Sequence, residues 1–509
     1  MASAERTRLM LKRSAIVVHR WLGVALCLFF LLWFPSGIGM MYWDFPGVTA
    51  ADRLDRSRAL DPSTIRLSPA EAFAAAGQSQ PPSQVRLNTY DGRPVYRFRV
   101  GRTESLVYAD TGERQSAVSG TLAARVASAW TKQPAAAASM VSLDAADQWT
   151  VSGSFAALRP LSKFSWPNGE QVYVAQASGE VVQYTTTASR IGAYLGPIPH
   201  WMYFTPLRRH QPAWTQVVIW SSGLGALAAL LGIVVGASIY SPSKRYRIDG
   251  AATAIPYRGQ KRWHAILGLI AGIGAATWAF SGMLSMDPFP SLAASAPAPI
   301  LQALRGRLEL AAFAAKDPRE ALDELPGRRV KEIELMSFGG EATYFATMGS
   351  GQSRVVPLGG PPRDGFDRQR IVELVAAARP EGLAETRLLD RYDAYYLDRR
   401  GDKPLPVILA RVSDAGHTRY YIDPRTARVV GSYSARSWVN RWLYHGLHSL
   451  DFPWLYAYRP LWDIVVIAFM LGGTALCVTS LILAWRVIGG YFFGGGVQRA
   501  GLSAGPLSR

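Results

Sequence analysis

The chain has 509 residues, 49% of them apolar, and a formal net charge of +18 at pH 7. We exclude nucleic acid as a partner, because the chain has no nucleic-acid-binding motif and much of its basic charge flanks long apolar runs, where it has a topological role. Both cysteines, Cys27 and Cys477, lie inside apolar runs, so the other segments must fold without disulfides.

Four apolar windows are long enough to cross a lipid bilayer, which takes about 20 apolar residues. The alternative of four buried helices in a soluble protein is disfavoured, because runs such as residues 24–34 contain no charge. The first window is too long for the core of a signal peptide, and no small-x-small cleavage site follows it. The windows are residues 16–43, 213–240, 263–286 and 460–487.

Lysine and arginine in the short flanking segments predict the orientation of the chain. The N-terminus (1–15), the loop 241–262 and the tail 488–509 are basic. We therefore expect both termini in the cytoplasm of a multi-pass protein of the bacterial inner membrane. Segments 44–212 and 287–459 are then exported to the periplasm.

The exported segments show the alternation of apolar and polar residues that is typical of β-hairpins. Residues 95–100 alternate, a Gly-Arg turn follows, and a second run leads to Asp110-Thr-Gly112. Similar hairpins begin near residues 171, 343 and 407, and short helices precede some of them. We expect two helix-plus-hairpin modules in each exported segment. The predicted fold class is a four-helix membrane protein with two exported α+β domains.

The two halves of the chain contain the same membrane motifs in the same order, which predicts a tandem repeat whose axis lies along the membrane normal. A His-x-x-x-Gly motif opens the first and third windows, and a Ser-Gly pair closes each of them. A second pair of histidines precedes the second and fourth windows. The matching positions are His19 and His264, Gly23 and Gly268, Ser36 and Ser281, and His200 and His448.

Histidines at matching membrane positions are candidate ligands of a cofactor on the repeat axis, because ionisable residues in a membrane are costly and are functional candidates by default. A haem between His19 and His264 would receive one imidazole from each side. Gly23 and Gly268, four residues later on the same helix faces, would leave room for the porphyrin. Two alternatives remain open: the histidines anchor the helices at the interface, and the glycines serve close helix packing.

The second pair, His200 and His448, predicts a second haem near the outer face. His445 lies three residues before His448 and is an alternative ligand or a partner for a propionate. A His-x-x-His zinc site lacks a nearby carboxylate or cysteine. Four arginines near this pair, which would bind haem propionates or lipid headgroups through their guanidinium groups, are Arg208, Arg209, Arg441 and Arg459.

These motifs give the chain a resemblance to the PepSY-associated transmembrane family. It rests on the hairpins, on His19-Arg-Trp-Leu-Gly23 and on residues 441–453 before the last window, and it covers nearly the whole chain. Some members are ferric-siderophore reductases that hold two b-type haems. The resemblance implies two b-type haems here, a ferric siderophore or other ferric chelate as acceptor, and a separate cytoplasmic electron donor, because the chain lacks the flavin reductase domain of some members.

Two other functions fit the same features. PepSY modules elsewhere are thought to inhibit or regulate peptidases, so the chain could be a membrane-anchored regulatory or binding protein without redox activity. Parallel repeats also build transporters, and an iron-chelate transporter is a third alternative. Against transport, no window has a charged residue near its midplane. A colourless purified protein would favour regulation, and uptake of metal without redox change would favour transport.

Overall fold

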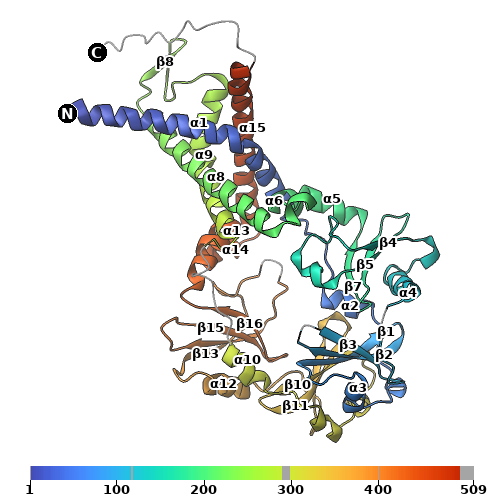
Figure 1. Ribbon diagram of the computed structural model, residues 1–509. Coiled ribbons are helices and arrows are strands. Elements are labelled where there is room, and N and C mark those ends of the chain that lie inside the picture. The colour runs from blue at the N-terminus through green and yellow to red at the C-terminus, as the bar shows by residue number, and fades with distance from the viewer. Residues whose placement is uncertain (1, 102, 116–117, 289–297, 399–400, 493–509) are drawn as a thin grey trace. The chain divides into compact units, whose positions relative to one another are not determined.

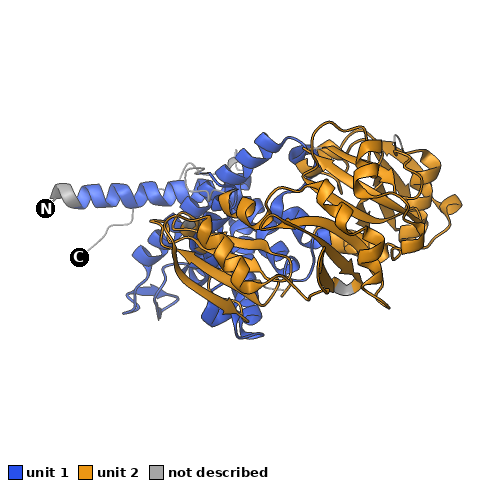
Figure 2. Ribbon diagram, turned by 90° about the horizontal axis from the view of Figure 1, so that it is seen from below, with its two compact units in different colours: residues 1–44, 192–289, 442–509 blue, residues 45–191, 290–441 orange. Residues whose placement is uncertain are grey.

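The computed structural model describes residues 2–101, 103–115, 118–288, 298–398 and 401–492. The chain divides into two compact units, which are coloured separately in Figure 2. Unit 1 contains Met1–Asp44, Gly192–Phe289 and Trp442–Arg509, and unit 2 contains Phe45–Ile191 and Pro290–Arg441. Each unit therefore combines segments from both halves of the chain.

Among the residues that the structure describes, unit 1 has four helices that are long and apolar enough to cross a membrane. Helix α1 packs against α8 and α15, and α9 packs against the same two helices, so α1 and α9 lie diagonally across the bundle. The bundle helices are α1 (Ala2–Gly39), α8 (Gln211–Ile239), α9 (Gly259–Leu284) and α15 (Leu461–Phe492). The last three begin and end within about six residues of the predicted windows.

Helix α1 is longer than its predicted window. Its 38 residues correspond to about 57 Å at 1.5 Å per residue, whereas the hydrocarbon core of a bilayer is about 30 Å thick. The first turns project away from the other three helices (Figure 1), and residues 5–11 are exposed. The sequence placed the helix start near residue 16, because the charged residues before it interrupt the apolar pattern without breaking the helix.

Short helices lie against the ends of the bundle helices. Helix α6 packs against α1, α7 against α8, α13 against α9 and α14 against α15. They are α6 (Pro197–Trp201), α7 (Thr205–Arg208), α13 (Leu447–Ser449) and α14 (Pro453–Tyr456), with a π-helix at Val439–Gly446 before α13. The sequence grouped residues 192–212 and 442–459 with the exported domains. In the structure they belong to unit 1, where Tyr203 packs against Trp214 of α8 and Tyr456 packs against Trp462 of α15.

Between α8 and α9 the chain forms a small hairpin of β8 (Tyr246–Ile248) and β9 (Ala251–Thr253). It lies in the basic loop that the sequence assigns to the cytoplasm.

The described residues of unit 2 form three antiparallel sheets. A six-stranded sheet has the order β12-β11-β10-β1-β2-β3, and two four-stranded sheets follow chain order. The strands are β1 (Gln84–Tyr90), β2 (Arg93–Val100), β3 (Thr103–Tyr108), β4 (Ser139–Leu143), β5 (Leu161–Ser165), β6 (Gln171–Ala175), β7 (Val181–Thr185), β10 (Val330–Phe338), β11 (Glu341–Met348), β12 (Ser353–Pro357), β13 (Leu383–Leu389), β14 (Val407–Val412), β15 (Arg419–Asp423) and β16 (Arg428–Tyr433).

Helices cover these sheets and supply part of their cores. Capping boxes at Thr49 and Ser68 begin α2 and α3. The helices of unit 2 are α2 (Ala50–Arg56), α3 (Pro69–Ala75), α4 (Gly120–Thr131), α10 (Ala298–Arg305), α11 (Pro318–Asp323) and α12 (Arg368–Ala377), and α5 (Thr187–Leu195) leads from unit 2 into unit 1.

The two segments that the sequence predicts to be exported share one sheet, which differs from the prediction of one separate domain per segment. Strand β1 of the first segment pairs with β10 of the second, with Val85 opposite Leu335. Their inward side chains enter one common hydrophobic core, and Asn88 donates a hydrogen bond to Glu332 at 2.8 Å. An unpaired edge strand favours such an addition, because its backbone groups need partners. Local alternation gives the strands but does not specify which strands pair.

Candidate functional site

The two histidine pairs singled out in the sequence are brought together in unit 1. His19 on α1 and His264 on α9 face each other across the bundle diagonal, with ring centroids 6.1 Å apart. His200 on α6 and His448 on α13 form a second pair, with ring centroids 5.9 Å apart and ring planes at 65°. Histidines separated by about 245 positions in the chain thus meet at two places in unit 1.

The spacing of both pairs suits a metal ion between the rings. Two imidazoles that bind one metal ion from opposite sides, with metal–nitrogen bonds of about 2.0 Å, have ring centroids roughly 6 Å apart. If the histidines merely packed against each other, nothing would require both pairs to have nearly the same centroid separation. The two histidines of each site therefore fit the ligand set of a haem iron.

Backbone carbonyls fix the tautomer of two of these histidines. His19 Nδ1 lies 2.8 Å from the carbonyl oxygen of Ala228, and His200 Nδ1 lies 3.1 Å from that of Trp33. A carbonyl can only accept, so Nδ1 carries the proton and donates it. In the neutral ring the lone pair is then on Nε2, which is the atom available to a metal.

Hydroxyl groups play the same part for the other two histidines. His264 Nδ1 lies 3.2 Å from Thr479 Oγ1, and His448 Nδ1 lies 3.0 Å from Ser281 Oγ. Each hydroxyl donates its own proton to the carbonyl three residues earlier in its helix. It therefore accepts from the histidine, and Nδ1 is again the protonated nitrogen. All four imidazoles are oriented in the way that second-shell groups orient metal-binding histidines.

The outer pair lines a cavity of about 190 Å³ within unit 1. Its walls are mostly aromatic, and they include Phe30, Trp33, Phe34, Trp201, Trp214 and Trp278. Concave apolar sites with a few convergent polar groups are typical of cofactor pockets. Desolvation by burial lowers the pKa of His200 to about 4, so this imidazole is neutral at physiological pH and able to bind a metal.

An unpaired donor in this cavity points to a bound group. Trp278 Nε1 is buried and has no hydrogen-bond partner within the described residues. The Nε of Arg208 is in the same situation, and its guanidinium group lies over the rings of Tyr203 and Trp214, both of which line the cavity. Buried donors are normally satisfied, and the carboxylates of a haem would supply acceptors.

The other predicted arginines lie in different surroundings. Arg459 forms an ion pair with Asp463 at 2.5 Å, Arg209 is exposed, and Arg441 belongs to unit 2, where it donates to the carbonyl of Ala394. The sequence grouped the four by their nearness to the outer histidines. Nearness in the chain did not reveal that the Arg459 charge is neutralised by Asp463, which lies about one helical turn further along the chain.

His448, and not His445, faces His200 and lines the cavity. The ring of Tyr444 contacts both histidines, with its centroid 4.4 Å from that of His445 and 5.6 Å from that of His448. Groups of three or more His, Cys, Asp or Glu side chains that could bind a metal ion do not occur among the described residues. A zinc site at His445-x-x-His448 therefore finds no further ligand there.

The glycines beside the inner pair leave space. A Cβ atom at Gly23 would meet nothing within 4 Å, and one at Gly268 would have its nearest neighbour at 3.9 Å. Close helix packing therefore does not explain Gly23. Gly232 on α8 was not singled out in the sequence, yet a Cβ there would lie 2.6 Å from His19 Cε1. This glycine makes room for the imidazole itself.

Several supporting residues were missed by the sequence reasoning. Ser36 and Ser281 mark the ends of the repeated apolar runs, and both approach the Nδ1 atom of an outer histidine. Their repetition was the signal that could have revealed this role. The sequence gave no sign that Thr479 or Trp278 belongs to a histidine site. A threonine or tryptophan is usual in an apolar helix, and the histidines near them are distant in sequence.

A comparison with protein families supports the resemblance noted in the sequence. The model of a family described as the PepSY-associated TM region matches residues 16–486. This range includes α8 and α9 in full, α1 from residue 16 onward, α15 up to residue 486, and both segments that the sequence predicts to be exported. No curated protein matched the chain.

Proposed function

We propose that this chain, which belongs to the PepSY-associated transmembrane family, carries electrons across the inner membrane through two b-type haems and reduces a ferric chelate on the periplasmic side. The observation that carries the proposal is the meeting of two equivalent histidine pairs at 6.1 and 5.9 Å, each with its Nδ1 atoms held by hydrogen bonds. A regulatory protein without a cofactor has no need of this arrangement.

The residues of each site have separate roles in this proposal. His19 and His264 would hold one haem, and His200 and His448 the other, and haem supplies one-electron redox chemistry. Two histidines in each site would leave the iron no free position for oxygen, so this ligand set would suit electron transfer better than oxygen binding. The aromatic walls around the outer pair would exclude water, and the Nδ1 hydrogen bonds would raise the basicity of the ligands, so both features would adjust the reduction potential of a bound haem.

The direction of electron flow follows from the proposed orientation. The basic segments 1–15, 241–262 and 488–509 would lie in the cytoplasm, and a separate cytoplasmic donor would reduce the inner site. The outer site would pass the electron to a ferric siderophore or another ferric chelate, whose iron(III) becomes iron(II). Weaker binding of iron(II) by such chelates would then release the metal for uptake.

Spheroplasts test both the activity and its orientation. Intact spheroplasts that contain the protein should reduce an impermeant ferric chelate added outside, faster than spheroplasts without it, with an iron(II)-trapping dye as the readout. Inverted vesicles from the same cells expose the opposite face, so a chelate outside them should be reduced no faster than in vesicles without the protein. Equal rates in spheroplasts with and without the protein would contradict the proposal.

A further inference from the structure

Unit 2 contains a second cavity, of about 310 Å³. It lies where α2, α4, the strands β1 and β2 and the turn between β6 and β7 come together. Its lining is polar and includes five arginines against three acidic residues, which are Arg53, Arg56, Arg58, Arg86 and Arg97, and Asp91, Glu180 and Glu332. The cavity thus has an excess of positive charge.

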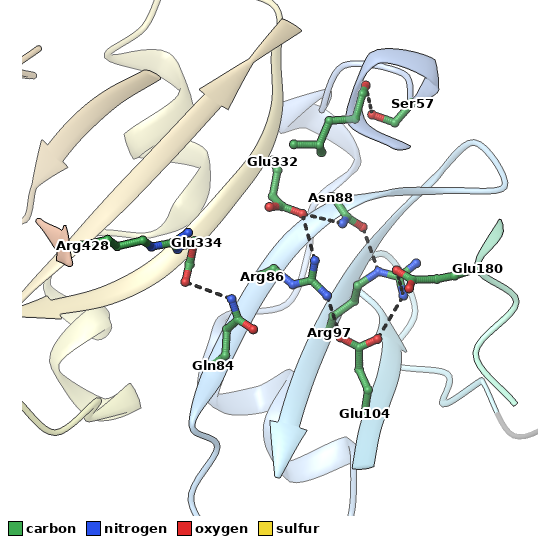
Figure 3. A network of polar contacts seen from close by, with 11 residues as sticks. Ser57, Gln84, Arg86, Asn88, Arg97, Glu104, Glu180, Glu332, Glu334 and Arg428 are labelled. Carbon is green, nitrogen blue, oxygen red and sulfur yellow. Dashed lines mark hydrogen bonds and ion pairs between the residues drawn. The ribbon is translucent and has the colours of Figure 1, made fainter. Parts of the chain in front are cut away.

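The floor of this cavity is a closed network of ion pairs (Figure 3). Arg97 is 4% exposed and binds Glu180 at 2.9 Å and Glu104 at 3.5 Å. Arg86 binds Glu104 at 2.7 Å and Glu332 at 3.7 Å. These two arginines are therefore neutralised within the protein, and the network holds the floor in one geometry.

The rim is different, because Arg53 and Arg58 form no ion pair within the described residues, and Arg56 forms a long one, with Asp52 at 4.0 Å. Within the described residues, the Arg58 side chain forms no hydrogen bond or ion pair. The Arg53 side chain donates a single hydrogen bond there, to the carbonyl oxygen of Val181 at 3.4 Å. Arg56 lies over the ring of Trp130 at 4.4 Å. Stabilisation of the α2 C-terminus accounts for basic residues in its last turn, but Arg58 follows the helix and is not explained in this way.

Two buried hydrogen-bond donors on the wall also lack acceptors. The hydroxyl of Tyr90 and Nε1 of Trp130 are buried without a hydrogen-bond partner in the part of the chain that the structure describes. Tyr90 is only 6% exposed. Buried donors are rarely left unpaired, and each instance calls for an explanation. Both residues line the cavity, so an acceptor placed inside it would satisfy them.

We propose that this cavity binds a small oxyanion, either a polycarboxylate or a phosphate, through Arg53 and Arg58 at the rim and through Tyr90 and Trp130 on the wall. Guanidinium groups bind both kinds of oxyanion in a bidentate manner, and the two wall donors add directed hydrogen bonds. Because Arg86 and Arg97 are already paired with acidic residues on the floor, those acidic residues do not bind the rim arginines, which stay available to a ligand. The proposal is independent of electron transfer, because all of these residues lie in unit 2.

Titration calorimetry on the full-length protein in detergent tests this proposal, with citrate and inorganic phosphate as separate probes in a buffer free of both. We expect one of them to bind, and the identity of that probe distinguishes the carboxylate from the phosphate. Arg58→Gln should weaken its binding about tenfold or more, because one charge-assisted contact is lost. Arg66→Gln is the matched control, since Arg66 is also exposed in this unit but does not line the cavity.

Tyr90→Phe separates binding from folding. The Tyr90 hydroxyl has no partner in the free protein, so its removal should weaken binding several-fold while leaving the melting temperature of the free protein unchanged or slightly raised. The proposal is overturned if neither citrate nor phosphate binds. It is equally overturned if a probe binds but Arg58→Gln and Tyr90→Phe bind it as tightly as the wild type. Neither result bears on haem content, which is measured separately.

Discussion

Replacing His264 by alanine is expected to lower the haem content from two to one per chain and to stop reduction of the external chelate. His264 faces His19 at 6.1 Å, so the variant leaves a single imidazole for the inner haem. An electron path in series fails when one carrier is missing. Haem would be counted by the pyridine haemochromogen method, and chelate reduction would be followed in spheroplasts.

Two further variants distinguish loss of a ligand from loss of structure. Methionine is also an axial ligand of haem iron and raises its potential, so His264→Met should keep more haem than His264→Ala and shift one midpoint potential upward. His210→Ala is the control, because His210 is exposed and belongs to neither pair. Two haems and normal chelate reduction in His264→Ala would show that this residue is not a ligand.

His448→Ala should remove the other haem and block the same path at its exit. His448 and His200 both line the outer cavity, and Ser281 fixes the orientation of the His448 ring. The inner haem should remain and should still be reducible from the cytoplasmic side. The expected spectrum is therefore that of one haem, with no reduction of the external chelate.

His445→Ala is the matched comparison for this site, because it removes a histidine from the same short segment. The structure places His448 opposite His200, so His445→Ala should keep two haems per chain. Loss of one haem in His445→Ala together with full retention in His448→Ala would reverse the assignment of the outer ligand.

The histidine pairs could be predicted from the sequence because the repeat carries geometric information. Two helices related by an axis along the membrane normal place equivalent residues on opposite sides of that axis. His19 and His264 were therefore expected to face each other across it. The four bundle helices could be predicted because length and apolarity alone identify a membrane span. Neither inference needs knowledge of side-chain packing.

Other features could not be predicted, because they depend on pairings distant in sequence. Nothing local in β1 or β10 shows that they are neighbours, and alternation specifies a strand without specifying its partner. The carbonyl of Ala228 that orients His19 is a backbone group, which any residue at that position would supply. The sequence suggested Arg459 as a partner for a haem propionate, but its guanidinium group forms an ion pair with Asp463.

The central claim is that two histidine pairs hold two b-type haems, and the most direct test is the haem content and absorption spectrum of the wild-type protein purified from haem-replete cells. We predict two haems per chain that acid acetone extracts, because the chain has no Cys-x-x-Cys-His motif for covalent attachment. Both should show the spectrum of iron with two axial histidines, before and after reduction by dithionite. A colourless protein with haem content near zero would contradict the claim.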